Sequence, residues 1–251
     1  MNDTIIFFGL ALISIAAFIM SGRTQKKTIG IWDIAFIGAF WNLFDTGWWF
    51  RFNWDQQAEP DILGMPYMLS ALSFALVFLA YVKRRGIDMG PAYSGSLLAI
   101  PKVPSGKKEI KILSLFVIAT VFIVLPIAYA MGFIAWTPDL RWGRMPVRLV
   151  EYVIFVGFVE ELVFRGTIQN LFAGTFNFKY GKEAAFFLAN LLFAFMWTHA
   201  SVPALINWNY IIMAFILGLF YAGVYVKSGS LWAAAFLHGL VDFLWITFFG
   251  G

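Results

Sequence analysis

Cysteine is absent from this 251-residue sequence, and charged residues are scarce. Without cysteine the chain can form neither disulfides nor thiolate metal sites, and it lacks a cysteine nucleophile. Asp, Glu, Lys and Arg make up 13% of the residues, against about a quarter in soluble domains, whereas apolar residues make up 61%. The composition therefore excludes an ordinary soluble domain and indicates a membrane protein.

Apolar runs long enough to cross the ~30 Å hydrocarbon core recur along the whole chain. They predict an all-α, polytopic membrane protein with about eight transmembrane helices in one bundle around a buried polar site. No polar segment is long enough to fold separately, so we expect residues 1–251 to form a single membrane domain. The predicted spans are 4–20, 29–50, 62–82, 112–133, 149–172, 184–202, 209–226 and 231–249.

The positive charges fall mainly on one side of these predicted spans, which holds 13 of the 18 Lys and Arg residues. By the positive-inside rule this side is cytoplasmic, and both termini are then outside. We expect a multi-pass protein of a prokaryotic cell membrane that contacts the lipid bilayer. The excess of basic charge is a topology signal, so we expect no nucleic-acid partner.

Three charges interrupt the apolar stretch LVEYVIFVGFVEELVFRGTIQNLF, namely Glu160, Glu161 and Arg165. Each costs roughly 2.5–3.5 kcal/mol at the centre of a spanning helix. Glu161 and Arg165 are four residues apart, on one helix face, and we expect them to form an ion pair. Glu160 then points about 100° away, without a partner on its own helix.

Both histidines of the chain lie on or near apolar helices. His238 and Asp242 are four residues apart, so we expect the carboxylate to hold one imidazole nitrogen and leave the other free. His199 follows Phe195 by four residues and has no such local partner. Since buried polar groups in hydrocarbon must find partners, we expect Glu160 to lie near His199 and the polar residues to converge.

A glutamate and histidines around a trapped water can activate that water for attack on a carbonyl. Other proteolytic signatures are missing: the sequence has no H-E-x-x-H helix and no serine in a nucleophile elbow. Two other interpretations stay open. The same side chains also suit interhelical hydrogen bonding, at about 0.6 kcal/mol per contact, and proton relays in transporters.

Three motifs occur in order: EELVFR at 160–165, FMWTH at 195–199 and HGLVD at 238–242. They fit E-E-x-x-x-R, F-x-x-x-H and H-x-x-x-[N/D]. In that order, with a glycine-rich lead-in to the third, the chain resembles the CPBP family over about residues 150–245. This is the CAAX-protease and bacteriocin-processing group, also called Abi, which includes the Rce1-like prenyl proteases.

The resemblance implies an intramembrane endopeptidase with a catalytic core over 148–250 and accessory N-terminal helices over 1–147. By the resemblance, Glu160 activates water with assistance from His199, while His238 and Asp242 stabilise the oxyanion. The supporting positions are Glu161, Arg165 and Phe195.

Position 242 departs from the Rce1-like pattern, which has asparagine there. An ionised aspartate cannot donate to an oxyanion, so we expect Asp242 to orient His238 and His238 to be the donor. A His₂Glu set of Glu160, His199 and His238 would suit catalytic zinc. The resemblance to the glutamate-type prenyl proteases favours no metal, so we expect no cofactor, with zinc as the alternative.

The sequence thus predicts a glutamate-type protease of a membrane-embedded or lipidated substrate, cut near its C-terminus or membrane anchor. The alternatives are a non-catalytic immunity or scaffold protein of the same family and a proton-coupled transporter.

Overall fold

The computed structural model describes residues 3–23, 28–45, 65–87, 89, 106–138, 140, 142–196 and 208–249, and these contain helices and no strand. The first helices are α1 (Asp3–Ser21), α2 (Ile31–Asp45), α4 (Met65–Arg85), α5 (Lys107–Ala119), η1 (Thr120–Val124) and α6 (Leu125–Ala130). A short η2 (Trp142–Arg144) leads into a long helix at 145–175, which we call the motif helix. Its segments are α7 (Met145–Glu151), η3 (Tyr152–Gly157), α8 (Phe158–Glu161), η4 (Leu162–Gln169) and α9 (Asn170–Thr175). The last are α10 (Gly181–Met196), α11 (Trp208–Ser228), α12 (Leu231–Leu244) and η6 (Trp245–Phe249).

The predicted all-α fold is confirmed, and each predicted span overlaps one continuous helical stretch of the described chain. Only three stretches in the described residues are both long and apolar enough to cross a membrane: 107–130, 208–228 and 231–249. Eight transmembrane helices are therefore not established. The α10 helix has 16 residues, or roughly 24 Å, shorter than the ~30 Å core, and the motif helix carries five charged side chains.

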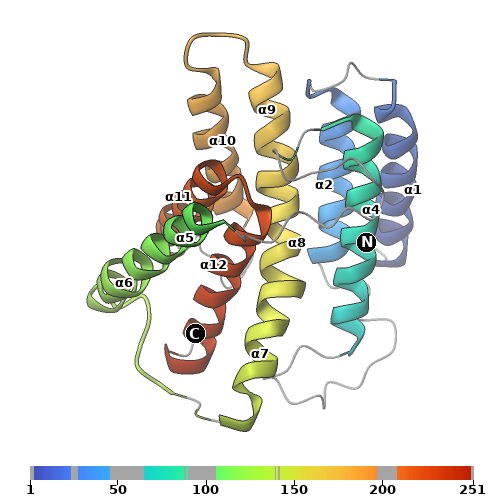
Figure 1. Cartoon of the computed structure of the whole chain (residues 1–251). Coiled ribbons are helices and arrows are strands. Elements are labelled where there is room, and N and C mark those ends of the chain that lie inside the picture. The colour runs from blue at the N-terminus through green and yellow to red at the C-terminus, as the bar shows by residue number, and fades with distance from the viewer. Residues whose placement is uncertain are drawn as a thin grey trace.

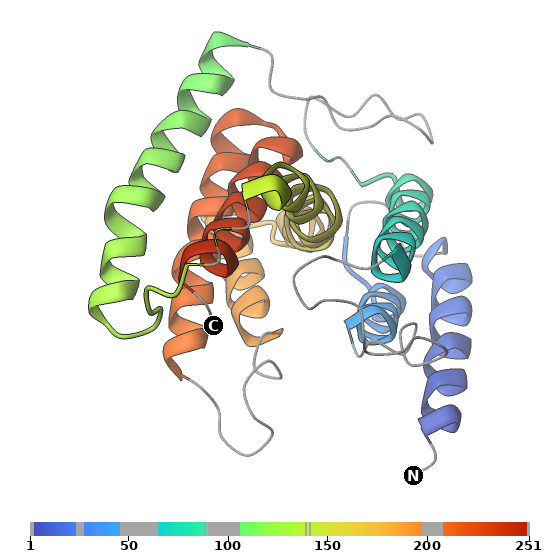
Figure 2. The ribbon, with the colours of Figure 1, turned by 90° about the horizontal axis from the view of Figure 1, so that it is seen from below.

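The helices form two groups with the motif helix between them (Figures 1 and 2). On one side α1, α2 and α4 pack together through a series of aromatic rings: Phe36 stacks on Tyr81 at 4.4 Å, and Phe40 stacks on Phe74 at 4.7 Å. On the other side lie α10, α11 and α12, with α5 and α6 along their outer edge. The polar residues of the motif helix are thus surrounded by other helices.

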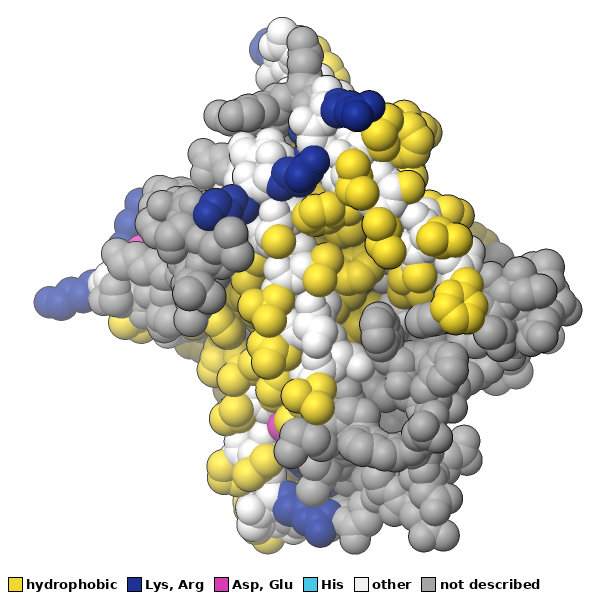
Figure 3. Space-filling view, turned by 90° about the vertical axis from the view of Figure 1, so that its right-hand side faces the viewer, with side chains coloured by type: hydrophobic (Ala, Val, Ile, Leu, Met, Phe, Trp, Pro, Cys, Tyr) yellow, Lys and Arg dark blue, Asp and Glu magenta, His cyan; other side chains and the backbone are white. Residues whose placement is uncertain are grey.

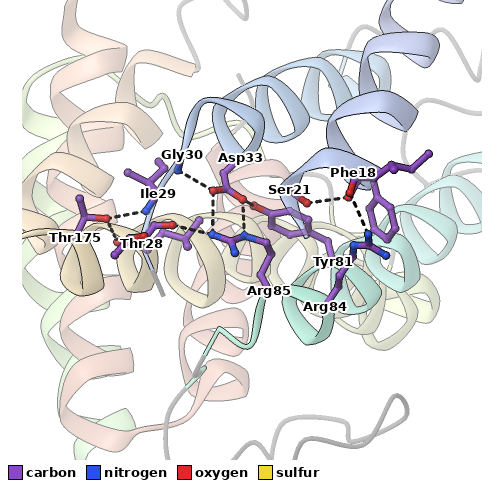
Figure 4. A network of polar contacts seen from close by, with 12 residues as sticks. Phe18, Ser21, Thr28, Ile29, Gly30, Asp33, Tyr81, Arg84, Arg85 and Thr175 are labelled. Atoms are coloured by element: carbon purple, nitrogen blue, oxygen red, sulfur yellow. Dashed lines mark hydrogen bonds and ion pairs between the residues drawn. The ribbon is translucent and has the colours of Figure 1, made fainter. Parts of the chain in front are cut away.

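A buried polar network joins the N-terminal helices to the end of the motif helix (Figure 4). The carboxylate of Asp33 pairs with Arg85 Nε at 2.6 Å and accepts from the hydroxyl of Tyr81. Beside it, the backbone N–H of Ile29 donates to Thr175 Oγ1 at 2.8 Å. This network attaches α2 and α4 to each other and the preceding loop to α9.

Two glycines allow α12 to pack directly on the motif helix. A Cβ placed on Gly239 would lie 2.5 Å from the Cα of Val153, and one placed on Gly157 would overlap the carbonyl of Ala235. Small residues commonly permit such close approach between membrane helices. Because Gly239 follows His238 directly, this contact brings His238 against the motif helix.

The exterior is largely hydrophobic. On the face seen in Figure 3, hydrophobic side chains cover the middle of the described surface and Lys and Arg side chains lie toward its ends. Exposed apolar residues occur on α1, α2, α5, α10 and α11. With the three candidate spans, this surface is that of an integral membrane protein.

Candidate active site

Glu160 and Glu161 lie on α8, a four-residue α-helical segment between the π-helical η3 and η4. Single-turn π-helical insertions are frequent at functional sites because they change which side chains face a neighbouring helix. Here both adjacent carboxylates are buried, at 5% and 0% exposure. The motif helix therefore presents two successive acidic groups to the interior.

The predicted pair of Glu161 and Arg165 is present, with Oε1 and Nη1 3.1 Å apart. The other guanidinium nitrogen of Arg165 donates to Asn190 Oδ1 at 3.0 Å and to the carbonyl of Gly218 at 2.8 Å. A Cβ on Gly218 would lie 2.8 Å from that Asn190 oxygen, so a larger residue here would displace the Asn190 amide. The ring of Phe193 lies 4.4 Å below the guanidinium, which adds a cation–π contact.

The carboxylate nearest His238 is Glu161, whose Oε1 lies 2.8 Å from Nδ1. The sequence predicted that Asp242 would hold one nitrogen of the ring, and Asp242 Oδ2 lies 3.5 Å from the other nitrogen, Nε2. Since an ionised carboxylate has no proton to give, Nδ1–H donates to Glu161. Glu161 thus bridges Arg165 and His238, a link between two helices that spacing along one helix does not reveal.

The second nitrogen of His238 faces the remaining carboxylates. Nε2 lies 3.5 Å from Asp242 Oδ2 and 3.7 Å from Glu160 Oε2. The imidazole stacks on the ring of Tyr221 at 4.5 Å, and the edge of Phe193 lies 5.7 Å away. The orientation of the ring is therefore fixed on one nitrogen by Glu161 and on its face by Tyr221.

A cavity of about 50 Å³ opens beside this histidine. His238 and Asp242 form its polar side. The rest consists of aromatic rings and aliphatic side chains, namely Phe133, Phe193, Tyr210, Met213, Ala214, Leu217, Tyr221 and Trp245. A water needs roughly 10–15 Å³ of such space and two to four polar partners. The cavity therefore has room for water next to Nε2.

Of the other predicted residues, one lies outside the described part of the chain and one lies away from this cluster. His199 lies outside the described residues, so its predicted approach to Glu160 stays a prediction. Phe195 lies on α10 and is 42% exposed, and the phenylalanine that contacts the histidine is Phe193. The predicted metal set is likewise incomplete here: Glu160 and His238 are close, and within the described part no group of three or more such side chains could hold a metal ion.

Sequence reasoning missed Asn190, Gly218, Tyr221 and Asp33. A usable signal existed for two of them. Asn190 is a single amide in the apolar run FFLANLLF, and Asp33 is a single carboxylate in IWDIAF. A lone polar residue at membrane depth indicates a buried partner. Tyr221 and Gly218 carry no comparable signal, because their roles depend on the packing of α11 against α10 and α12.

Comparison with known proteins gives one match. Residues 142–244 match the family model described as Type II CAAX prenyl endopeptidase Rce1-like. No curated protein and no solved structure gives a significant match. The matched region contains Glu160, Glu161, Arg165, His199, His238 and Asp242. Residues 142–244 of this chain are therefore similar to the Rce1-like family of type II CAAX prenyl endopeptidases, as the ordered motifs predicted.

Proposed function

We propose that this chain is an intramembrane endopeptidase that hydrolyses a peptide bond near the C-terminus or membrane anchor of a membrane-associated, lipidated substrate. Similarity to a protease family supports the general activity. The observation that carries the mechanism is the geometry at His238: Nδ1 is held by Glu161, while Nε2 faces Glu160 and Asp242 beside a water-sized cavity.

In the proposed reaction Glu160 is the general base. It takes a proton from water as the water oxygen bonds to the scissile carbonyl carbon, and the carbonyl electrons move onto oxygen. The protonated Glu160 then gives that proton to the departing amine as the C–N bond breaks. The oxyanion electrons re-form the carbonyl as the bond breaks, so one water is consumed and a carboxylic acid and an amine are formed. A positioned general base typically contributes roughly 10²–10⁴-fold to such a rate.

His238 is the proposed oxyanion donor. Its Nδ1–H donates to Glu161, so the Nε2–H of the doubly protonated ring is directed toward the cavity. Asp242, 3.5 Å from Nε2, orients the ring rather than donating itself. Removing a single oxyanion donor typically lowers kcat roughly 10²–10³-fold. The rate effect of losing this donor is therefore comparable to that of losing the base.

The proposed substrate class is supported by the description of the matching family, Type II CAAX prenyl endopeptidase Rce1-like. We propose a peptide whose anchor, a lipid or an apolar tail, places its C-terminal segment at the depth of Glu160. A farnesylated peptide ending in a CAAX sequence is the first probe, and a tail-anchored peptide without the lipid is the second.

The deciding experiment compares wild type with Glu160→Gln. Purified protein in lipid discs is assayed on the two probes, and membrane proteomes of cells with either form are searched for uncut C-terminal tails. Glu183→Gln is the matched control, because Glu183 is exposed at the start of α10. We expect Glu160→Gln alone to lower the cleavage rate, roughly 10²–10⁴-fold, while remaining folded.

Other outcomes identify the alternatives. A folded Glu160→Gln protein with unchanged tails and unchanged cellular phenotype indicates the scaffold or immunity role. Loss of pH-linked flux in vesicles, with no cleavage by either form, indicates a transporter.

We also propose that the reaction needs no metal. The assay is repeated after dialysis against a strong chelator, and bound zinc is measured by elemental analysis. Unchanged cleavage by protein free of stoichiometric zinc is expected. Loss of cleavage that zinc restores would contradict the proposal and assign Glu160, His199 and His238 as ligands.

A further inference from the structure

An apolar slot of about 290 Å³ lies between α2 and the motif helix, with α10 on its third side. Its floor is buried, since Trp41 and Phe164 are 3% and 1% exposed. Its mouth is open, since Ile34, Gly38 and Leu192 are exposed. A slot of this form receives its ligand laterally, from the hydrocarbon phase that surrounds the helices.

The slot is separated from the candidate active site by two aromatic rings. Phe164 faces the slot and packs against Phe193 with ring centroids 5.1 Å apart. The other side of Phe193 covers the guanidinium of Arg165 and contacts His238. A molecule in the slot therefore does not reach the polar cluster, and its occupant is not the segment being cleaved.

The lining selects hydrocarbon rather than water. All residues around the slot are apolar or glycine, and apolar cavities stay dry, while those of about 150 Å³ already bind benzene. On α2 the lining residues run from Ile34 to Trp41, which rise roughly 10 Å at 1.5 Å per residue. That length fits within one leaflet, roughly 15 Å or half of the ~30 Å hydrocarbon core, which is the depth that one acyl chain occupies.

One end of the slot is polar and basic. There the Ile29 N–H donates to Thr175 Oγ1 (Figure 4), and Lys179 and Lys182 are exposed on the adjoining segment. Lys182 and Met196 both lie on α10, 14 positions apart, and Met196 lines the slot. At 100° per residue this spacing puts them within roughly 40° of each other around the helix axis, so Lys182 lies on the face of α10 that lines the slot. Basic side chains at the end of an interhelical pocket attract anionic lipid headgroups.

We propose that the slot binds one acyl chain of an anionic bilayer phospholipid, with its headgroup beside Lys179 and Lys182. Contacts between α2 and the motif region hold the slot at both ends, at Ile29–Thr175 and at Trp41–Phe164, whose rings are 5.3 Å apart. The lipid chain fills the space between these contacts and completes the junction of the N-terminal helices with the motif helix. The proposal does not depend on the proposed protease activity.

Gly38→Leu is the test variant, because a Cβ at Gly38 meets no atom within 4 Å and the new side chain fills the slot without a clash. Gly9→Leu on α1 is the matched control, since its Cβ also meets no atom within 4 Å. Each protein is extracted in native lipid, washed in detergent to strip loosely held lipid, and analysed by native mass spectrometry with added phosphatidylglycerol or phosphatidylcholine. We expect wild type and Gly9→Leu to retain one phosphatidylglycerol, and Gly38→Leu to lose at least tenfold of that occupancy.

Equal retention by all three proteins, or no retained lipid in wild type, would overturn the proposal. Equal retention of the two lipids would overturn the headgroup assignment. Because a fold defect in Gly38→Leu would also release lipid, wild type is crosslinked separately with a phosphatidylglycerol that carries a diazirine on its acyl chain. Label on residues 34–41 and 163–168 supports the slot, whereas label confined to other helices would overturn it.

Discussion

The N-terminal helices and the motif helix each bury an arginine against a carboxylate, but they surround the pair differently. Asp33 accepts from Arg85, the Tyr81 hydroxyl and the backbone N–H of Gly30 (Figure 4), so the single carboxylate has donors on both oxygens. Around Glu161 and Arg165 two further carboxylates face one imidazole nitrogen beside a cavity. In the first arrangement the polar groups hold helices together. In the second, His238 and Asp242 also line a cavity that has room for water.

The largest difference in activity between the two regions is expected for Glu160→Gln, compared with any change in the Asp33 network. We expect Glu160→Gln to lower kcat roughly 10²–10⁴-fold, because it removes the proposed base, while thermal unfolding stays within the range of wild type. Single-turnover cleavage of the farnesylated probe and a melting curve in discs check both parts. Full cleavage by the folded variant would show that Glu160 is not the base.

Asp33→Asn should show the reverse pattern. Removing one partner of a buried ion pair leaves the other charge uncompensated and typically costs about 3–5 kcal/mol; Asp33 and Arg85 are both fully buried. We expect a large fall in unfolding midpoint and an unchanged kcat per folded molecule, measured below that midpoint. A selective loss of kcat with normal stability would place this network in the catalytic machinery.

Tyr221→Leu tests how much the stacked ring contributes to holding His238 in place, because it removes that ring. Aromatic contacts of this kind contribute about 0.5–1.5 kcal/mol, so we expect kcat to fall roughly 2- to 12-fold with little change in KM. Phe220→Leu is the control, because its ring packs on Phe116 instead. Equal effects of the two variants would reduce the role of Tyr221 to general packing.

Asp242→Asn should have the smallest effect. Its carboxylate is 3.5 Å from Nε2, and if it only orients the ring the loss is that of one i,i+4 contact within α12, about 0.5 kcal/mol, or roughly twofold in kcat. Rates on the farnesylated probe decide this. A rate above wild type would instead show that an amide donor at 242 serves the oxyanion directly.

The helices were predictable from the sequence because each long apolar run between turn residues corresponds to one helical stretch, and 231–249 agrees at both ends. The ion pair of Glu161 and Arg165 was predictable for the same reason, since four residues is a spacing within one helix. The same pattern did not settle which helices cross the membrane. The described α10 helix has 16 residues, and the motif helix carries charged side chains.

Contacts between helices could not be predicted from the sequence. The bond between Glu161 and His238 joins residues 77 positions apart, and that between Arg85 and Asp33 joins residues 52 positions apart. Local periodicity carries no information on such registers. Asp242 was predicted to hold one imidazole nitrogen of His238 because the two residues are four apart on one helix, whereas the packing of α12 against α8 places Glu161 nearer to the ring.

Because Gly239 has no side chain, α12 can approach the motif helix closely, and the site tolerates no larger residue at this position. Because main chain touches main chain where α12 meets Val153, the separation of the two helices that carry His238 and Glu160 is set by backbone contact. A methyl group at Gly239 would push these helices apart where His238 Nε2 and Glu160 Oε2 lie 3.7 Å from each other.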